Sequence, residues 1–114
     1  MAKQRQNIKS YIFDKRGRVL SIGSNSYISS TRLQRYHARK TGNPEKIYLH
    51  SEVDAISRCV NLNKAHRILV VRIGTNGEYL LSKPCEVCMS AIEATPIRIV
   101  QWSENGYCEH DLSI

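Results

Sequence analysis

The chain has 114 residues, of which 41% are hydrophobic and 24% are charged, and this is the composition of a soluble globular protein. The length suits a single domain over residues 1–114 with one core, and it excludes two. No apolar run approaches the ~20 residues that cross a bilayer, and the basic start lacks the apolar segment of a secretory signal. We therefore expect a cytoplasmic protein with no membrane partner, whose four cysteines are reduced.

The net charge of +7 is unevenly distributed along the chain. Residues 1–40 hold ten Lys or Arg side chains and one acid, a net charge of +9, whereas residues 41–114 hold seven and nine, a net charge of −2. Because such a field attracts phosphate, an anionic substrate or partner is expected to meet the N-terminal third. A basic surface that serves only solubility explains the same pattern equally well.

An antiparallel hairpin is expected near the start of the chain. Residues 11–13 and 19–22 are rich in strand formers, and Gly17 lies in the turn between them. The turn-forming residues 23–26 then end the second strand.

A helix is expected over residues 31–40, capped by Thr31 or Ser30 and ended by the Gly-Asn-Pro sequence at 42–44. Helical spacing divides its side chains between two faces, one with Arg32, Arg35 and Arg39 and the other with Leu33, Tyr36 and His37. We interpret the arginine face as the solvent side, with phosphate contact as the alternative, and His37 as a packed or surface residue.

A second helix is expected from near His50 to about Leu62, with Cys59 as a small core residue. Its apolar side chains recur at helical spacing and form the expected buried stripe: Val53, Ile56 and Val60. Residues 67–73 are a nearly unbroken β-branched run, which suits a strand covered on both faces. We expect this strand to be the central one.

The last third of the chain continues the alternation of helices and strands. Residues 85–94 are expected to form a third helix and residues 97–102 a strand, and the hairpin signal at 104–106 leads to an antiparallel closing strand. The pattern predicts an α/β fold with helices on both faces of a mixed sheet of about five strands, joined by right-handed crossovers.

Cys85 and Cys88 stand three residues apart on the first turn of the third helix, directly after Pro84. Both sulfurs can therefore point to one spot, and the helix dipole favours their thiolate forms. The pair suits a metal ion or disulfide exchange. Redox pairs normally follow an early strand, whereas this pair lies late in the chain, and we therefore favour a metal.

His50 and Glu52 would point about 200° apart inside a helix, so they can serve one site only if the second helix begins there. Ser51 and an acid in the first turn are typical of a helix start. Together with the two cysteines, this predicts a zinc centre with His50, Cys85 and Cys88 as ligands and a fourth position for water. Glu52 is then the base that takes the proton of that water.

At these residues the chain resembles the zinc-dependent cytidine and deoxycytidylate deaminase family, and in size it is similar to small phage-encoded members. The most specific pieces are His50-Ser51-Glu52 and Pro84-Cys85-Glu86-Val87-Cys88, whose first ligands are 35 residues apart. The resemblance implies a three-layer α/β/α cytidine-deaminase-like fold. It also implies that His50, Cys85 and Cys88 hold Zn²⁺ and that Glu52 is catalytic.

Three further features follow from the same resemblance. Gly23-Ser24-Asn25 is similar to the Gly-x-Asn that ends the family's second strand, which implies that Asn25 holds the substrate's sugar or base. Having His50 instead of a third cysteine resembles the deoxycytidylate, tRNA and editing branches, and family members commonly form homo-oligomers. Ser51 stands where many relatives have alanine, and we assign it no catalytic role.

The predicted function is hydrolytic deamination of a cytosine-type base in a free nucleotide or nucleoside such as deoxycytidylate. An alternative is the same chemistry on cytosine or adenine in single-stranded DNA or RNA, supported by the basic N-terminal third and by Trp102 and Tyr107 as stacking surfaces. A different class is a structural-zinc, nucleic-acid-binding module in which four ligands close the ion's coordination: Cys85, Cys88, Cys108 and His110.

Overall fold

The computed structural model describes residues 7–26, 28, 30–46, 48–104 and 107–113, the last range by its backbone alone. Within these ranges, no helix is long and apolar enough to cross a membrane. The elements in chain order are β1 (Asn7–Phe13), β2 (Val19–Ser24), α1 (Arg32–Lys40), α2 (Ser51–Arg58), η1 (Leu62–Lys64), β3 (Arg67–Ile73), β4 (Tyr79–Leu80), α3 (Glu86–Glu93), β5 (Ile99–Glu104) and β6 (Tyr107–Ser113).

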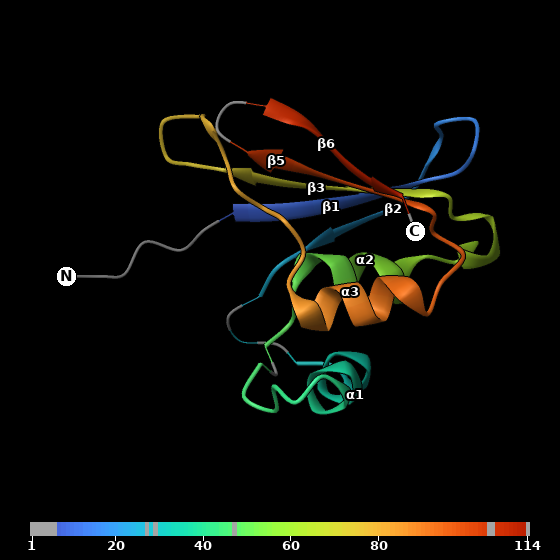
Figure 1. The fold of residues 1–114 in the computed structure, drawn as a ribbon, viewed down its shortest axis with the longest axis vertical. Coiled ribbons are helices and arrows are strands. Elements are labelled where there is room, and N and C mark those ends of the chain that lie inside the picture. The colour runs from blue at the N-terminus through green and yellow to red at the C-terminus, as the bar shows by residue number, and fades with distance from the viewer. Residues whose placement is uncertain (1–6, 27, 29, 47, 105–106, 114) are drawn as a thin grey trace.

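The strands form a mixed sheet in the order β2-β1-β3-β5-β6, with β4 paired to the end of β3 (Figure 1). β1 is antiparallel to β2 and β3, β3 is parallel to β5, and β6 is antiparallel to β5. The α/β class, the first hairpin, the central place of β3 and the closing strand are therefore confirmed. Gly17 has φ 82° in the first turn, as expected of a glycine. The predicted turn at 105–106 lies outside the described residues.

The described helices all lie on one face of the sheet, with α2 and α3 against the strands and α1 beneath them (Figure 1). The expectation of helices on both faces, in an α/β/α order, is therefore wrong for this part of the chain. β2, β3 and β5 are mutually parallel and follow one another in the same direction across the sheet. Right-handed crossovers that step the same way put their helices on the same face.

β3 is buried on one face only. Ile68 and Val70 are fully buried beneath the helices, whereas Leu69 and Val71 are half-buried on the open face. The predicted cover on both faces of β3 is therefore wrong. The side chains on the open face are apolar as well. The sequence of β3 therefore shows no alternation of polar and apolar residues, although the burial of its side chains does alternate.

The hydrophobic core lies between the sheet and the two helices that cover it. Its members come mainly from β1, α2, β3, α3 and β5 and include Ile12, Val53, Ile56, Ile68, Val70, Ile92, Val100 and Trp102, and Ile97 joins them from the segment before β5. Cys59 belongs to this core, as predicted.

α2 begins at Ser51, as predicted, but ends at Arg58, before the expected end at Leu62. Cys59 is already extended, with ψ 106°, and Val60 is 93% exposed, so the place of Val60 in the buried stripe is wrong. The residues that follow Arg58 include valine and two asparagines, which have low helix propensity.

α1 has the predicted span and is capped by Thr31, whose Oγ1 accepts a hydrogen bond from the Gln34 N–H at 3.1 Å. Its buried face holds Gln34, His37 and Ala38, whereas Tyr36 is 57% exposed and does not share that face as expected. His37 Nδ1 lies 2.8 Å from Ser90 Oγ of α3, so His37 is a packing residue, as interpreted from the sequence.

Gly23 lets α2 approach β2 very closely. A Cβ at this position would collide with the backbone nitrogen of Ala55 and the carbonyl oxygen of Ser51, and would lie 2.8 Å from Ala55 Cα. The obstructing atoms are helix backbone, which cannot turn away. The absent side chain of Gly23 therefore sets the position of α2 on the sheet.

We predict that Gly23→Ala lowers the free energy of unfolding by about 3 kcal/mol, the upper part of the range for overpacking. The matched control is Gly74→Ala, where an added Cβ meets mainly the side chain of Glu78, which is exposed and can rotate. Urea unfolding followed by circular dichroism measures both. Equal losses in the two variants would contradict the assigned role of Gly23.

Candidate metal centre

Two helix N-termini meet at the candidate site. His50 is the N-cap of α2, with φ −87° and ψ 153°, and Cys85 is the N-cap of α3, with φ −74° and ψ 173°. Neither side chain caps its own helix, so both are available to the site. The required helix start at His50 is therefore confirmed, and Figure 1 shows both helices beginning at the same end of the molecule.

His50, Cys85 and Cys88 form a cluster whose ligand atoms all lie within 4.8 Å of one another. His50 Nδ1 is 3.1 Å from Cys88 Sγ and 3.5 Å from Cys85 Sγ, and the two sulfurs are 3.6 Å apart. Tetrahedral coordination with Zn–S of about 2.3 Å and Zn–N of about 2.05 Å requires separations of about 3.8 Å and about 3.5 Å. The cluster is therefore within a few tenths of an ångström of a shape that could hold such an ion.

The cluster already favours negative charge on sulfur. The hydrogen bond between the two cysteines, helped by His50, lowers the pKa of Cys85 to about 3. The same hydrogen bond and burial raise the pKa of Cys88, and the contact with Cys85 raises that of His50. One thiolate beside a basic imidazole is a starting point for cation binding, which displaces the remaining protons.

Glu52 lies in the first turn of α2 and is only 5% exposed. The hydroxyl of Ser51 donates a hydrogen bond to Glu52 Oε1 at 2.8 Å, and Ser10 of β1 lies 2.7 Å from that hydroxyl. Burial raises the pKa of the Glu52 carboxyl above its ordinary value, and the Ser51 hydrogen bond opposes this. The side chain is thus a buried, oriented carboxyl group that can exchange a proton.

Gln34 ties α1 to the start of α2. Its Oε1 accepts a hydrogen bond from the His50 N–H at 3.2 Å, and its Nε2 donates to the Lys46 carbonyl at 2.9 Å. Because Gln34 is fully buried, this amide fixes the backbone from which the His50 side chain extends. Sequence reasoning missed it, although a glutamine on the buried side of a basic helix is a detectable signal.

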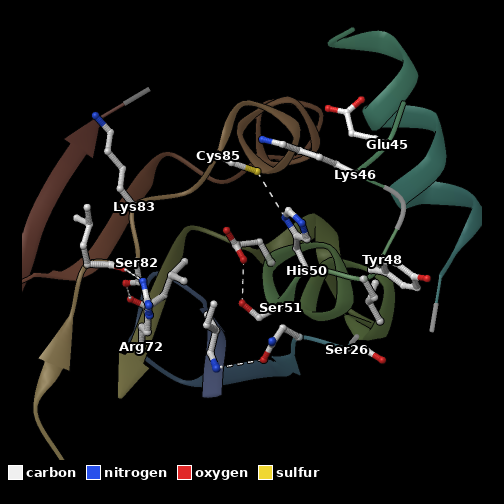
Figure 2. A pocket seen from close by; sticks show the side chains of 16 residues that line it. Ser26, Glu45, Lys46, Tyr48, His50, Ser51, Arg72, Ser82, Lys83 and Cys85 are labelled. Atoms are coloured by element: carbon white, nitrogen blue, oxygen red, sulfur yellow. Dashed lines mark hydrogen bonds between the residues drawn. The ribbon is translucent and has the colours of Figure 1, made fainter. Parts of the chain in front are cut away.

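The cluster lies beside a pocket of about 450 Å³ (Figure 2). Asn25, the residue expected to contact the substrate, is among the lining residues, and its Oδ1 accepts a hydrogen bond from the Ile8 N–H at 3.1 Å. The other lining residues come mainly from the loops before α2, from β3 and from the segment before α3: Ile8, Ser26, Glu45, Lys46, Tyr48, Leu49, His50, Ser51, Glu52, Val70, Arg72, Leu81, Ser82, Lys83 and Cys85.

Two pocket residues were missed or discounted in the sequence. Ser51, given no catalytic role, holds the Glu52 carboxyl, and its position between the two motif residues could have indicated this. Ile68, Val70 and Arg72 are alternate residues of β3 and lie on the same face. A charged residue in a series that otherwise faces the core could have indicated a functional role for Arg72.

Other predicted features fall away from this pocket or outside the described side chains. Trp102 is 8% exposed and belongs to the core, so its role as a stacking surface is wrong. The side chains of Tyr107, Cys108 and His110 lie outside the described residues.

Comparisons with protein-family models, curated proteins and solved structures gave no match.

We predict that the purified protein binds about one equivalent of divalent metal, and that His50→Ala, Cys85→Ala and Cys88→Ala each weaken binding by at least about 100-fold, because each removes a direct ligand. Cys59→Ala is the matched control, since Cys59 is a buried free cysteine outside the cluster. Metal content by mass spectrometry and thiolate charge-transfer bands with Co²⁺ provide the readout.

A different result would indicate the structural-zinc arrangement. In that case His50→Ala would keep its metal, whereas Cys108→Ala or His110→Ala would lose it.

Proposed function

We propose that this protein is a zinc-dependent hydrolase that deaminates a cytosine-type base in a free nucleotide or nucleoside. The observation that carries the proposal is the place of Glu52, a buried carboxyl group in the same pocket as His50 and Cys85. Among the described residues the cluster supplies three ligands, and three ligands with one further position are typical of catalytic zinc. A structural zinc site, in which four protein ligands fill the coordination of the ion, does not require a buried acid beside it.

The ligand types support zinc as the ion. One imidazole and two thiolates suit zinc better than magnesium or calcium, which prefer oxygen. When bound, zinc acts as a Lewis acid and brings the pKa of a water molecule towards ~7.

Glu52 carries the proton transfers in the proposed reaction. Its carboxylate takes one proton from the attacking water and delivers it to the ring nitrogen of the base. It then takes the second proton, from the hydroxyl group that has added to the ring, and delivers it to the leaving amine. The amino group departs as ammonia, and the oxygen of the water remains on the ring as the new carbonyl. Ser51 keeps the carboxyl group in one orientation, so this small residue is a positioning residue in the mechanism.

The resemblance to the cytidine and deoxycytidylate deaminases agrees with this proposal. A parallel β3–β5 pair joined through α3 and a second helix that starts at the histidine support a cytidine-deaminase-like fold with one sheet face uncovered. Asn25 lies on the pocket wall next to β1, which supports its proposed contact with the sugar or base.

We predict that zinc-loaded protein converts at least one of deoxycytidylate, dCTP, cytidine and deoxycytidine, measured by ultraviolet absorbance loss and ammonia release. Glu52→Gln should lower kcat about 10²- to 10⁴-fold, because it removes the proton carrier but keeps the shape. Zinc content and Tm should stay unchanged. Glu93→Gln, an exposed acid of α3, is the control and should keep full activity. No turnover of any of the four substrates by the parent protein would refute the proposal.

The alternative substrate, a base in single-stranded nucleic acid, is supported by the outer face of α1. Arg32, Arg35, Arg39 and Lys40 surround Tyr36 on this face, and a shallow hollow lies between them. Tyr36 is 57% exposed, so its ring can stack on a base while the arginines meet phosphates. Phosphate contact by the arginines of α1 was the less favoured interpretation of the sequence, and the exposed face around Tyr36 is a specific surface on which it can occur.

Salt dependence tests this alternative. If α1 binds a polynucleotide, affinity for a cytosine-containing single strand should fall steeply with salt. Arg32→Gln with Arg39→Gln should reduce the log–log slope by about 1.4, because each phosphate contact on a single strand contributes about 0.7. The control pair is Lys64→Gln with Arg98→Gln, exposed cations outside this face. Fluorescence anisotropy across a salt series provides the measurement. Equal effects of the two pairs would indicate nonspecific charge attraction.

A further inference from the structure

Arg72 is a cation on the face of β3 that carries the core. It follows Ile68 and Val70 on that face and pairs with Ile8 of β1 and Leu80 of β4. Its side chain therefore enters the pocket instead of the solvent on the open face. The residue is half-buried, and even partial burial of a charge without an opposite charge is unfavourable.

The guanidinium of Arg72 lacks the partners that such a group usually has. Its Nε is buried without a hydrogen-bond partner, and its Nη1 makes one long hydrogen bond of 3.3 Å to the Leu81 carbonyl. Among the described residues, the ion pairs are Arg18–Asp14 and Arg58–Asp54, so no carboxylate neutralises Arg72. Buried polar groups are normally satisfied, so the Arg72 guanidinium is an exception, and its terminal nitrogens can donate to an anion in the pocket.

The position of Arg72 across the pocket defines what kind of ligand fits. Figure 2 shows Arg72 and Ser82 on the wall across from His50, with Lys83 on the same side. The metal cluster lies near one end of the pocket together with Lys46 and Glu45, and Arg72 lies near the other end. An arginine fork is suited to two oxygens of one phosphate group, which a neutral nucleoside lacks.

We propose that Arg72 binds the phosphate of a nucleoside monophosphate and makes this protein selective for the nucleotide over the nucleoside. The terminal nitrogens of the guanidinium, which reach the exposed part of the pocket, donate to the phosphate oxygens, and Lys83 is a second cation among the residues that line the pocket. The inference rests on the proposed deaminase function for the identity of the base. The role of Arg72 itself requires only that the ligand carries an anionic group.

The first test compares selectivity, expressed as kcat/KM for deoxycytidylate over that for deoxycytidine. Arg72→Gln should lower this ratio at least about 10-fold, mainly through the KM of the nucleotide, and Arg72→Lys should retain part of it. Arg67→Gln is the matched control. Arg67 is on the same strand, but its guanidinium lies 4.0 Å from the centre of the Phe13 ring and donates to Gln101 on the open face. An unchanged ratio in Arg72→Gln would overturn the proposal.

The second test separates this proposal from the deaminase function. Equilibrium dialysis with zinc-loaded Glu52→Gln protein compares deoxycytidylate, deoxycytidine and a five-nucleotide single strand that contains one cytosine. Tighter binding of deoxycytidylate that depends on Arg72 supports the phosphate site even if no substrate is ever turned over. Tighter binding of the oligonucleotide than of the mononucleotide overturns it.

The same measurement remains decisive if Arg72→Gln does not fold. Deoxycytidylate must bind the Glu52→Gln protein with intact Arg72 more tightly than deoxycytidine does. If it does not, the proposal fails without any substitution at Arg72.

Discussion

The candidate site depends on one constraint, the meeting of two helix N-termini at the same end of the sheet. It arises because β2, β3 and β5 are parallel and the crossovers between them step in one direction, which places α2 and α3 side by side. Each helix then presents its N-cap side chain, His50 or Cys85, to the same point. The positive ends of the helix dipoles also face that point, which stabilises the thiolates of the cluster.

Buried polar side chains hold this arrangement in place. Gln34 fixes the backbone of His50 from outside the sheet, and Ser10 and Ser51 connect β1 to the carboxyl group of Glu52. Such groups contribute little to stability when satisfied but are costly when one partner is lost, so they favour a single geometry. Gly23 acts in the same direction through its size, since it allows α2 to sit against β2.

Much of this could be predicted from the sequence, because local patterns determine local structure. Spacing and capping residues indicated the helix starts and hence the ligand cluster of His50, Cys85 and Cys88. The layering could not be predicted, because the helix faces depend on strand order, which no local pattern encodes. The roles of Gln34, Ser51 and Arg72 depend on partners distant in sequence, at Lys46, Ser10 and the pocket wall, and single side chains do not reveal such pairs.

α1 packs on helices instead of strands, through contacts such as His37 with Ser90, and it meets the site through Gln34. If α1 undocks, the His50 N–H loses its acceptor and the first ligand loses its anchor. The docking of α1 and the occupancy of the cluster are therefore thermodynamically linked, and the coupling free energy is the same in both directions. A ligand that binds α1 only in its docked position would strengthen the binding of an ion by the cluster, and loss of a bound ion would weaken the packing of α1.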